Sequence, residues 1–502
     1  MSRKENKKQN LIYIVGAGLA GTSIADEIQK KGILGKAVAF LDDDPKKIGK
    51  KINGLPVLGP IDEVANLIRI NPADEALISI PTIKIERLRE IYEVLKQSGF
   101  STIKLLPALS QIVEGSAHLV QTREINPEDL LGRNPIAISL KKTLAYLKGK
   151  RVLITGAGGS IGSELSRQLF TGGAERVYLL GHGENSIYQI NKELRILQEA
   201  GVGENAIIVP IIGDLTDRDY VRYIIKQLRC DIVFHAAAYK HVPLMEANPV
   251  AAISNNVFGT KNLLDACFEF NVKRFVLIST DKAVEPVCVY GVSKFLSEQL
   301  VLATAEKIKK EKPKGLDYMF VRFGNVLGSR GSIFPLWVEQ VKNGGPVTVT
   351  DKKMSRYFMT ITEACSLVLQ TGGLGKNACS YLLDMGEPVS IYETAKQLIK
   401  YLGYEPEKEI EIKIIGLRKG ERLEEPLWSK SEMPEKTDYS KILKLNKIEN
   451  IKNTFSITGL NKLLNELYPI CYLTQNEQLF RNKTKLLRIL KKEFPDLKSD
   501  IK

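Results

Sequence analysis

Two stretches of the chain show the same pattern of hydrophobic and polar positions: an apolar run, a glycine-rich turn and a helical period. The first is LIYIVGAGLAGTSIADEI, from Leu11, and the second is KRVLITGAGGSIGSELSRQL, from Lys150. An apolar run that enters such a turn and continues with helical periodicity predicts a strand–turn–helix unit. Because two such starts occur, the sequence predicts an α/β fold with two tandem Rossmann-like, doubly wound, parallel-sheet domains.

The segments after each start set the expected domain boundaries. Later apolar runs in the second half, VYLL, AIIVPIIG, IVFHAAA, FVLIS and YMFVRF, alternate with helical stretches, which favours a mostly parallel sheet. We therefore expect a nucleotide-binding domain over 1–121, a linker over 122–149, a larger domain with a smaller C-terminal lobe over 150–444, and a helical extension over 445–502.

Composition and charge narrow the class of partner. Hydrophobic residues make up 44% and charged residues 26% of the 502, and the net charge is +14. No basic run is interleaved with aromatic residues, as a nucleic-acid groove requires, so we expect no nucleic-acid partner. The positive balance fits a lysine-rich solvated surface and also suits a pocket for a diphosphate substrate.

Cysteines and apolar stretches indicate the compartment. The six cysteines contain no CxxC pair, which is typical of reduced thiols rather than of a disulfide or zinc framework. The apolar stretches are strand-sized, well short of the roughly 18 residues that a spanning helix needs, and the polar start MSRKENKKQN is no signal peptide. We expect a cytoplasmic chain without a membrane span. His182, His235 and His241 lack a ligand spacing, so we expect no metal.

The first glycine turn has the GxGxxG spacing of a dinucleotide site, formed by Gly16, Gly18 and Gly21. Glycines permit a tight turn and bring a pyrophosphate close to a helix N-terminus. Asp42 ends the run VAFLDDD, where a carboxylate would bond a ribose hydroxyl. The pattern predicts an unidentified nucleotide ligand. The alternative is a fold that has lost its ligand and serves regulation or assembly.

The second glycine turn, TGAGGSIG, places Gly156, Gly159 and Gly162 in TGxxGxxG spacing. Backbone amides and a helix N-terminus would again face phosphate. The position for a ribose-binding acid is Gly181, so a 2′-phosphate meets no repulsion there. We therefore favour NADP over NAD, with His182 or Arg167 near the phosphate. Asp214, in GDLTD, is placed to contact adenine.

The stretch FVLISTDKAVEPVCVYGVSKFLSEQL carries the candidate catalytic groups. Thr280, Asp281 and Lys282 follow an expected strand. Tyr290 and Lys294 stand four residues apart, which puts both on one face of a helix. An ammonium beside a phenol lowers the tyrosine pKa from about 10 towards working pH. Tyr290 would then be a competent base for a sugar hydroxyl.

Together with this stretch, several others resemble the UDP-N-acetylhexosamine 4,6-dehydratases of capsule, O-antigen and protein-glycosylation type, in the extended short-chain dehydrogenase family. The resemblance runs from about Leu130 to Pro426. It is carried by GAGGSIGSEL, HAAAYKHVPLMEANP, STDKAVEP, VRFGNVLGSRGSIFPLW, GGPVTVTDKKMSRYFMTITEA and GLRKGERLEEPL.

The resemblance implies a reaction and a role for each catalytic residue. Thr280 would bond the sugar 4-oxygen, and Tyr290 would remove the hydroxyl proton while a hydride leaves carbon 4 for the nicotinamide. Lys294 would hold the nicotinamide ribose. Asp281 and Lys282 would serve as acid and base for loss of water across carbons 5 and 6, in either assignment. The stored hydride returns to carbon 6, which gives a UDP-4-keto-6-deoxy amino sugar.

The resemblance also implies two binding sets. The cofactor would lie against Gly156, Gly159, Ser160, Ile161, Gly162, His182, Asp214, Leu215, Ala236, Ala237, Ala238, Tyr290 and Lys294. The UDP-sugar would lie against Lys240, Asn325, Arg330, Arg356, Arg418 and Glu421.

Two departures from the family pattern shape the expectation. Many large members have methionine where this chain has Tyr290, so the ordinary proton-transfer route is open here. Large members also commonly carry N-terminal transmembrane helices, which this sequence lacks. That favours a soluble enzyme or a truncation, and the family tendency implies a homo-oligomer.

Two rival functions remain. A UDP-sugar 4-epimerase shares the oxidation at carbon 4 but needs no acid–base pair after the threonine. A non-catalytic nucleotide-sensing module would not need Thr280, Tyr290 and Lys294 together. The sequence therefore favours the dehydratase, with UDP-N-acetylglucosamine as the family substrate.

Overall fold

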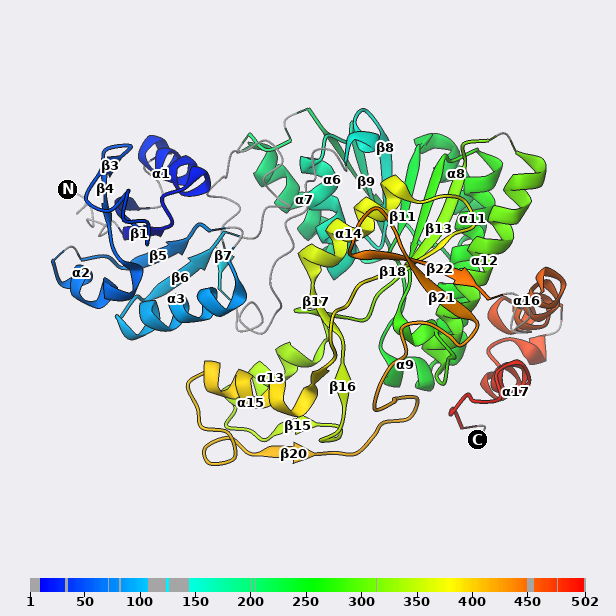
Figure 1. Cartoon of the computed structure of the whole chain (residues 1–502). Coiled ribbons are helices and arrows are strands. Elements are labelled where there is room, and N and C mark those ends of the chain that lie inside the picture. Colours follow the sequence, from blue (N-terminus) through cyan, green and yellow to red (C-terminus); the bar gives the residue numbers. More distant parts are fainter. Residues whose placement is uncertain are drawn as a thin grey trace, which may run out of the picture. The chain divides into compact units, whose positions relative to one another are not determined.

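The protein is described from a computed structural model that covers residues 10–31, 35–70, 72–80, 83–106, 123–125, 144–199, 201–203, 205–312, 314–448, 456–475 and 477–500 (Figure 1). Two compact units emerge, Met1–Lys141 with Ile196–Glu204, and Lys142–Arg195 with Asn205–Lys502. Most of the predicted linker, 122–149, lies outside the described residues. No described helix has both the length and the apolar character needed to cross a bilayer.

The first unit is built on a seven-stranded sheet in the order β3-β4-β2-β1-β5-β6-β7. The central pairs are parallel, and β3 and β7 pair antiparallel at the edges. Its core contains Ile12, Ile14, Ile24, Phe40 and Leu77. The elements are β1 (Leu11–Val15), α1 (Leu19–Lys31), β2 (Lys36–Leu41), β3 (Lys51–Ile52), β4 (Leu55–Leu58), α2 (Val64–Ile70), β5 (Glu75–Ile78), α3 (Ile85–Gln97), β6 (Thr102–Leu105) and β7 (Arg123–Glu124).

The second unit is built on a nine-stranded sheet in the order β10-β9-β8-β11-β12-β13-β18-β22-β21. Neighbours from β10 to β18 are parallel, and β22 and β21 are antiparallel. The strands are β8 (Arg151–Thr155), β9 (Arg176–Gly181), β10 (Ile207–Ile212), β11 (Ile232–His235), β12 (Arg274–Ile278), β13 (Asp317–Arg322), β18 (Ser380–Leu383), β21 (Glu432–Lys436) and β22 (Ile442–Lys447). The two sheets confirm the predicted α/β class.

Helices flank this second sheet, and several begin at a side-chain cap, which supplies an acceptor for an otherwise unpaired amide. Asp217 caps α8, Thr360 caps α14, and Cys288 caps the 23-residue α12. The helices are α6 (Ser160–Thr171), α7 (Glu184–Glu199), α8 (Arg218–Leu228), α9 (Val242–Ala247), α10 (Pro249–Ala252), α11 (Gly259–Glu269), α12 (Val289–Glu311) and α14 (Ile361–Leu374). A π-helical turn, Ile253–Phe258, joins α10 to α11.

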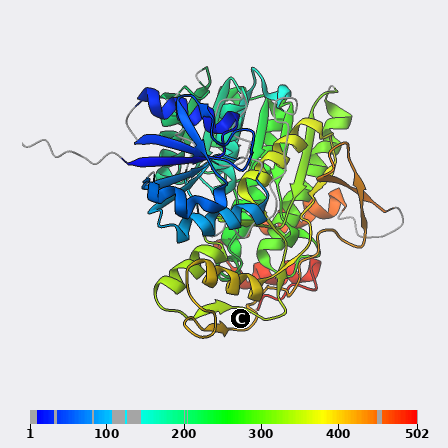
Figure 2. The ribbon, with the colours of Figure 1, turned by 60° about the vertical axis from the view of Figure 1, so that its left-hand side comes forward.

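A smaller lobe is inserted between the later strands of the second unit and lies below the sheet in Figures 1 and 2. It holds three short strand pairs, β14–β17, β15–β20 and β16–β19. Its elements, and the strands that lead into it, are β14 (Asn325–Leu327), α13 (Ile333–Lys342), β15 (Val347–Val349), β16 (Ser355–Arg356), β17 (Phe358–Thr360), β19 (Val389–Ser390), α15 (Ile391–Tyr401) and β20 (Ile412–Ile414).

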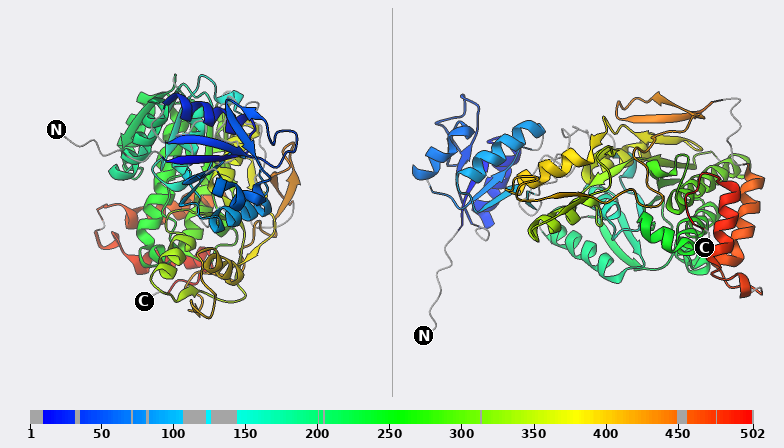
Figure 3. Two further views of the ribbon diagram at one scale, coloured as in Figure 1. Left: turned by 90° about the vertical axis from the view of Figure 1, so that its left-hand side faces the viewer. Right: turned by 90° about the horizontal axis from the view of Figure 1, so that it is seen from below.

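The C-terminal part begins with a strand and continues with helices. Strand β22 continues to Lys447, past the boundary predicted at 444, because its residues pair along β18 and β21. Helices α16 (Ile457–Cys471) and α17 (Lys483–Glu493) follow and pack on α10 and α12 (Figure 3). Their leucines enter the main core, which ties this extension to the helices that carry the candidate site.

Candidate active site

The glycine turn after β8 opens into a cavity of about 250 Å³ at the carboxyl ends of the parallel strands. Gly156 has φ +66°, and a Cβ there would lie 2.7 Å from the backbone of Ala237. A Cβ on Gly162 would lie 2.1 Å from Gly156 O, so both positions require glycine. Of the predicted cofactor residues, the cavity is lined by Gly156, Gly159, His182, Leu215, Ala236, Ala237 and Ala238.

Three other residues of the predicted cofactor set are not among the lining residues of the cavity and make hydrogen bonds within the protein. Ser160 Oγ accepts a 2.9 Å hydrogen bond from Arg330 N, which joins the glycine turn to the loop after β14. Ile161 O accepts from Cys365 Sγ at 3.5 Å. Asp214 is exposed, and its Oδ1 accepts from both the amide and the hydroxyl of Thr216. That carboxylate oxygen is therefore used within its own loop.

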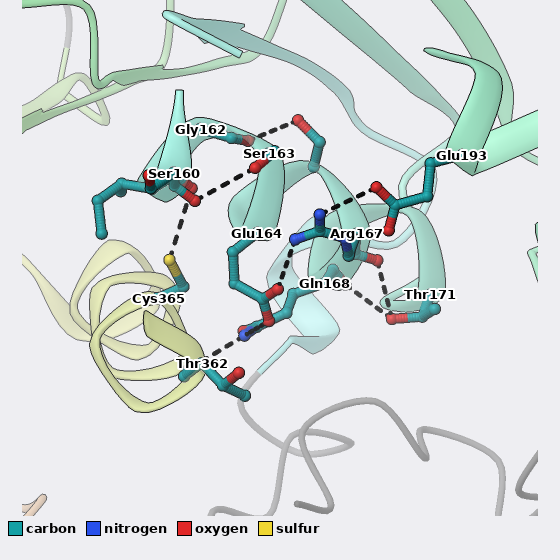
Figure 4. A network of polar contacts seen from close by, with 12 residues as sticks. Ser160, Gly162, Ser163, Glu164, Arg167, Gln168, Thr171, Glu193, Thr362 and Cys365 are labelled. Carbon is teal, nitrogen blue, oxygen red and sulfur yellow. Dashed lines mark hydrogen bonds and ion pairs between the residues drawn. The ribbon is translucent and has the colours of Figure 1, made fainter. Parts of the chain in front are cut away.

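Arg167 is not available for a cofactor phosphate, contrary to our expectation. Its guanidinium pairs with Glu164 at 2.8 Å and with Glu193 of α7 at 2.5 Å (Figure 4). Glu164 also accepts from Gln168, which donates to Thr362 O at the start of α14. Two carboxylates therefore hold the Arg167 side chain. Of the two basic residues predicted near the cofactor 2′-phosphate, His182 remains the candidate.

The candidate catalytic groups meet where β12 ends. Thr280 Oγ1 donates to Asp281 Oδ1 at 2.8 Å, and Lys282 Nζ donates to the same oxygen at 3.1 Å. Lys282 Nζ also donates to Asn325 Oδ1 at 3.3 Å and lies 3.8 Å from Glu425 Oε1. The structure thus brings the predicted threonine, the acid–base pair and Asn325 into one cluster.

The cluster is buried and charged. Asp281 is 1% exposed, and in the described part of the chain its Oδ2 has no hydrogen-bond partner. Burial alone would lower the pKa of Lys282, but the carboxylates of Asp281 and Glu425 outweigh it and raise that pKa. Burial raises the pKa of Glu425. Lys282 is therefore protonated in the free chain, and Asp281 has an oxygen ready to accept a further bond.

Tyr290 and Lys294 lie on the first turns of α12, yet the predicted effect on the tyrosine pKa is wrong for the free chain. Burial raises the pKa of Tyr290, Asp281 adds to the rise, and a hydrogen bond with Thr280 opposes it. Lys294 Nζ donates to Ile278 O at 2.7 Å, and burial lowers its pKa to about 8. The ammonium is thus engaged by the backbone, and desolvation of the phenol dominates.

The predicted substrate residues fall into separate groups. Lys240 Nζ donates to Ser329 Oγ at 3.3 Å, and the Arg330 guanidinium donates to Gly158 O, so both side chains lie beside the cavity of the glycine turn. Arg418 and Glu421 share an exposed loop, in which Glu421 accepts from Arg418 N at 3.1 Å. The structure does not bring this loop pair into the cluster around Lys282.

Arg356 does not offer the predicted fork for phosphate. Its NH1 donates to Ser355 O and Leu423 O, both at 2.7 Å, and its NH2 donates to Arg422 O at 2.6 Å. The side chain is 7% exposed and lies 3.7 Å from Glu425. A guanidinium so enclosed by carbonyls positions the loop that carries Glu425 instead of binding a solvent-facing anion.

The sequence analysis did not predict two polar residues at the site, Glu425 and Asn256. Glu425 lies in the family-like stretch GLRKGERLEEPL, but nothing in its spacing shows that it faces Lys282. Asn256 in the π-helical turn receives the amide of Tyr239 at 2.8 Å and donates to Ser293 Oγ at 2.9 Å. The π-turn itself, a feature frequent at functional sites, has no sequence signature here.

The first unit uses its predicted ribose acid internally. Asp42 Oδ2 accepts from Ala17 N at 2.7 Å and from Lys47 Nζ at 3.0 Å, and Oδ1 accepts from Asp44 N at 2.9 Å. The carboxylate therefore braces the turn of Gly16, Gly18 and Gly21. Burial alone would raise the pKa of Asp42, but these bonds lower it. The prediction that Asp42 awaits a ribose is not met in this structure.

Comparison with known proteins assigns the chain to a family. Residues 152–447 match the family model described as polysaccharide biosynthesis protein, and the chain belongs to that family. Residues 1–107 match the model of a CoA-binding domain. The resemblance stated from the sequence is thereby confirmed at family level.

Individual relatives span several activities. A probable polysaccharide biosynthesis protein EpsC of Bacillus subtilis is 40% identical over 88% of this chain and 72% of its own length. A UDP-N-acetylglucosamine 4,6-dehydratase (inverting) of Campylobacter jejuni is 30% identical over 68% and 97%. A UDP-glucose 4-epimerase of Rickettsia bellii is 32% identical over 58% and 80%. Among solved structures, Pen from Bacillus thuringiensis is 32% identical over 56% of this chain and 84% of its own, with a TM-score of 0.51.

We predict that Glu425→Gln moves the pH profile of turnover. Removing this carboxylate leaves Lys282 with one fewer negative neighbour, so the pKa of Lys282 falls. The limb of the kcat profile that reports Lys282 should therefore move to lower pH. Glu424→Gln, an exposed neighbour, serves as the control. An unmoved profile in Glu425→Gln would separate Glu425 from the chemistry.

Proposed function

We propose that the second unit is a 4,6-dehydratase that converts a UDP-N-acetylhexosamine, with UDP-N-acetylglucosamine as the expected substrate, to its UDP-4-keto-6-deoxy product. The observation that carries the proposal is the pair of buried Asp281 and half-buried Lys282, held against Thr280 and one short loop away from Tyr290. A 4-epimerase moves one hydrogen at carbon 4 and needs no second acid–base pair. The pair therefore favours elimination of water.

The cavity of the second glycine turn fits a nicotinamide dinucleotide. The glycine positions leave the room that side chains would fill, and the helix N-terminus of α6 supplies amides for a diphosphate. The cofactor would supply temporary oxidation at carbon 4 of the sugar, with no net consumption. His182, Ala236, Ala237 and Ala238 line this cavity, whereas Tyr290 and Lys294 are not among its lining residues in the described part of the chain.

The residues themselves supply proton transfer and orientation. Thr280 and Tyr290 would hold the 4-hydroxyl, and Tyr290 would accept its proton once Lys294 and the cofactor favour the phenolate over the buried phenol. Asp281 and Lys282 would then exchange protons at carbon 5 and at the departing 6-hydroxyl. Because Lys282 is protonated in the free chain, it must lose that proton first if it acts as the base.

We further propose NADP over NAD. The support is Gly181 at the end of β9, and the residues that line the cavity in the described part of the chain, which include His182 and Arg330 and no carboxylate. A carboxylate at that strand end would repel a 2′-phosphate.

His182→Asp should reverse this preference. The new carboxylate would bond a ribose hydroxyl and repel the 2′-phosphate, so we expect affinity for NADP to fall at least about tenfold relative to NAD. Titration of both cofactors by calorimetry checks it, with His182→Asn as the uncharged control. Equal losses for the two cofactors would contradict the assignment.

The direct test is to incubate the protein with UDP-N-acetylglucosamine in heavy water and follow the sugar by NMR and mass spectrometry. Loss of one water, a new methyl signal and deuterium at carbon 5 would establish the dehydratase. Recovery of UDP-N-acetylgalactosamine would establish the epimerase instead, and an unchanged sugar would refute both for this substrate.

A further inference from the structure

The loop that joins Lys282 to Tyr290 is held in place by segments outside it. The Arg422 guanidinium donates to Val284 O at 3.3 Å and to Glu285 O. Glu285 has φ +42°, in the left-handed region that a residue with a side chain rarely adopts. A backbone conformation of this kind persists where surrounding contacts impose it, and it is common next to active sites.

The C-terminal segment Leu497–Asp500 makes a further contact with this loop. Lys498 N donates to Val287 O at 3.0 Å, three residues before Tyr290. Leu497 is 3% exposed within the main core, and Ser499 is 2% exposed, while Lys498 and Asp500 face solvent. This alternation shows an extended segment with one buried side, built into the second unit and not lying loosely on it.

Ser499 reaches the first turn of the catalytic helix through one carboxylate. Its hydroxyl donates to Glu246 Oε2, and Glu246 Oε1 accepts from Val289 N at 2.7 Å. Val289 is the first residue of α12, and Tyr290 is the second. Glu246 thus caps the helix that presents the tyrosine, and Ser499 fixes the orientation of that carboxylate.

The same segment also contacts a second loop, the one that carries Lys419 and Gly420. Asp500 pairs with Lys419. A Cβ on the adjacent Gly420 would lie 2.6 Å from Cys288 Cβ and 3.5 Å from Glu246 Oε1. The loop that carries Lys419 and leads on towards Glu425 is therefore packed directly against the cap of α12.

We propose that Leu497–Asp500 is a positioning element of the active site, which sets the start of α12 and the loop between Lys282 and Tyr290 through Glu246 and Val287. The proposal rests on the dehydratase function of the second unit. The segment lies outside residues 152–447, the part that matches the family model. Part of the positioning thus comes from a segment outside the matched part, in addition to the contacts that Arg422 and Glu246 make within it.

The test uses the full chain and two substitutions at one exposed position. Lys498→Pro removes the N–H that donates to Val287 O, whereas Lys498→Ala keeps it. We expect Lys498→Pro to lower kcat on UDP-N-acetylglucosamine by about 10- to 100-fold with little change in KM, because small displacements of catalytic groups are costly. Lys498→Ala should match the parent, and all three should share one thermal unfolding midpoint. A parental kcat in Lys498→Pro would overturn the proposal.

A second readout is independent of turnover. Amide hydrogen exchange in peptides that cover residues 283–292 should be faster in Lys498→Pro than in Lys498→Ala or the parent. Unchanged exchange would overturn the proposal. Faster exchange in a chain whose parent does not turn over the sugar would refute the dehydratase function while leaving the structural coupling standing.

The contribution of Ser499 can be separated in the same way. Ser499→Ala removes the donor to Glu246 Oε2 and should lower kcat, and Ser499→Thr, which restores a hydroxyl, should recover most of it. A purely structural role would instead lower the unfolding midpoint with kcat unchanged, and that result would contradict positioning through Glu246.

Discussion

Lys282→Met should lower turnover of UDP-N-acetylglucosamine by about 10²- to 10⁴-fold, the range that a positioned acid or base contributes. The variant loses the ammonium that contacts Asp281 and Asn325 and leaves two buried carboxylates, Asp281 and Glu425, facing each other. Loss of water across carbons 5 and 6 then lacks one of its proton carriers. Initial rates and deuterium incorporation at carbon 5 measure the effect.

The matched control is Lys342→Met, an exposed lysine at the end of α13 in the small lobe. It removes the same charge from the chain without touching the cluster, and its rate should equal that of the parent. A Lys282→Met variant that retains parental turnover would exclude the acid–base pair and, with it, the distinction from an epimerase.

The fold was predictable because its signals are local. Each glycine turn is framed by an apolar strand and a helical period within about 20 residues, which is the span that sequence patterns read well. The structure places Gly156 at positive φ against Ala237, as that spacing requires. The C-terminal strands of the second sheet were harder to predict, because β22 is recognised as a strand only through its pairing with β18 and β21.

Residue types at the site were predictable, but their partners were not. The sequence shows that Arg356, Arg167 and Asp42 are charged groups near glycine turns or family motifs. It does not show that Arg356 already donates to backbone carbonyls, that Arg167 already pairs with two glutamates, or that Asp42 already accepts from amides of the turn. A charged side chain satisfied inside the protein looks the same in sequence as one that awaits a ligand.

The tyrosine prediction failed for a related reason. A spacing of four residues brings Lys294 to the same helix face as Tyr290, but it gives neither burial nor the direction of the ammonium. Lys294 donates to Ile278 O, and burial raises the pKa of Tyr290. The pKa at which the Tyr290 phenol would act as a base therefore depends on groups of the substrate and cofactor that come close to it on binding.

A buried ion network lies next to the end of β12. Arg322, 3% exposed, donates two bonds to Glu298, each at 2.7 Å, and pairs with Glu432 of β21 at 2.7 Å. Glu298 also accepts from Ser279 at 2.6 Å, directly before Thr280. The network thus links α12, the end of β12 that precedes Thr280, and the β21–β22 hairpin.

Arg322→Met should destabilise the second unit by about 3–5 kcal/mol, because removing one partner leaves buried carboxylates without compensation. Burial raises the pKa of Glu432, but Arg322 outweighs it and holds that pKa below its ordinary value. A lowered carboxyl pKa stabilises the fold above the unfolded pKa and loses this contribution as pH falls. The difference in unfolding free energy between parent and variant, measured with denaturant, should therefore be largest near neutral pH and shrink towards acid.

Arg222→Met, which removes an exposed arginine paired with Glu269, is the control and should leave the unfolding free energy unchanged. Equal losses of unfolding free energy in the two variants would mean that the ion pairs of Arg322 contribute no more than an exposed ion pair does.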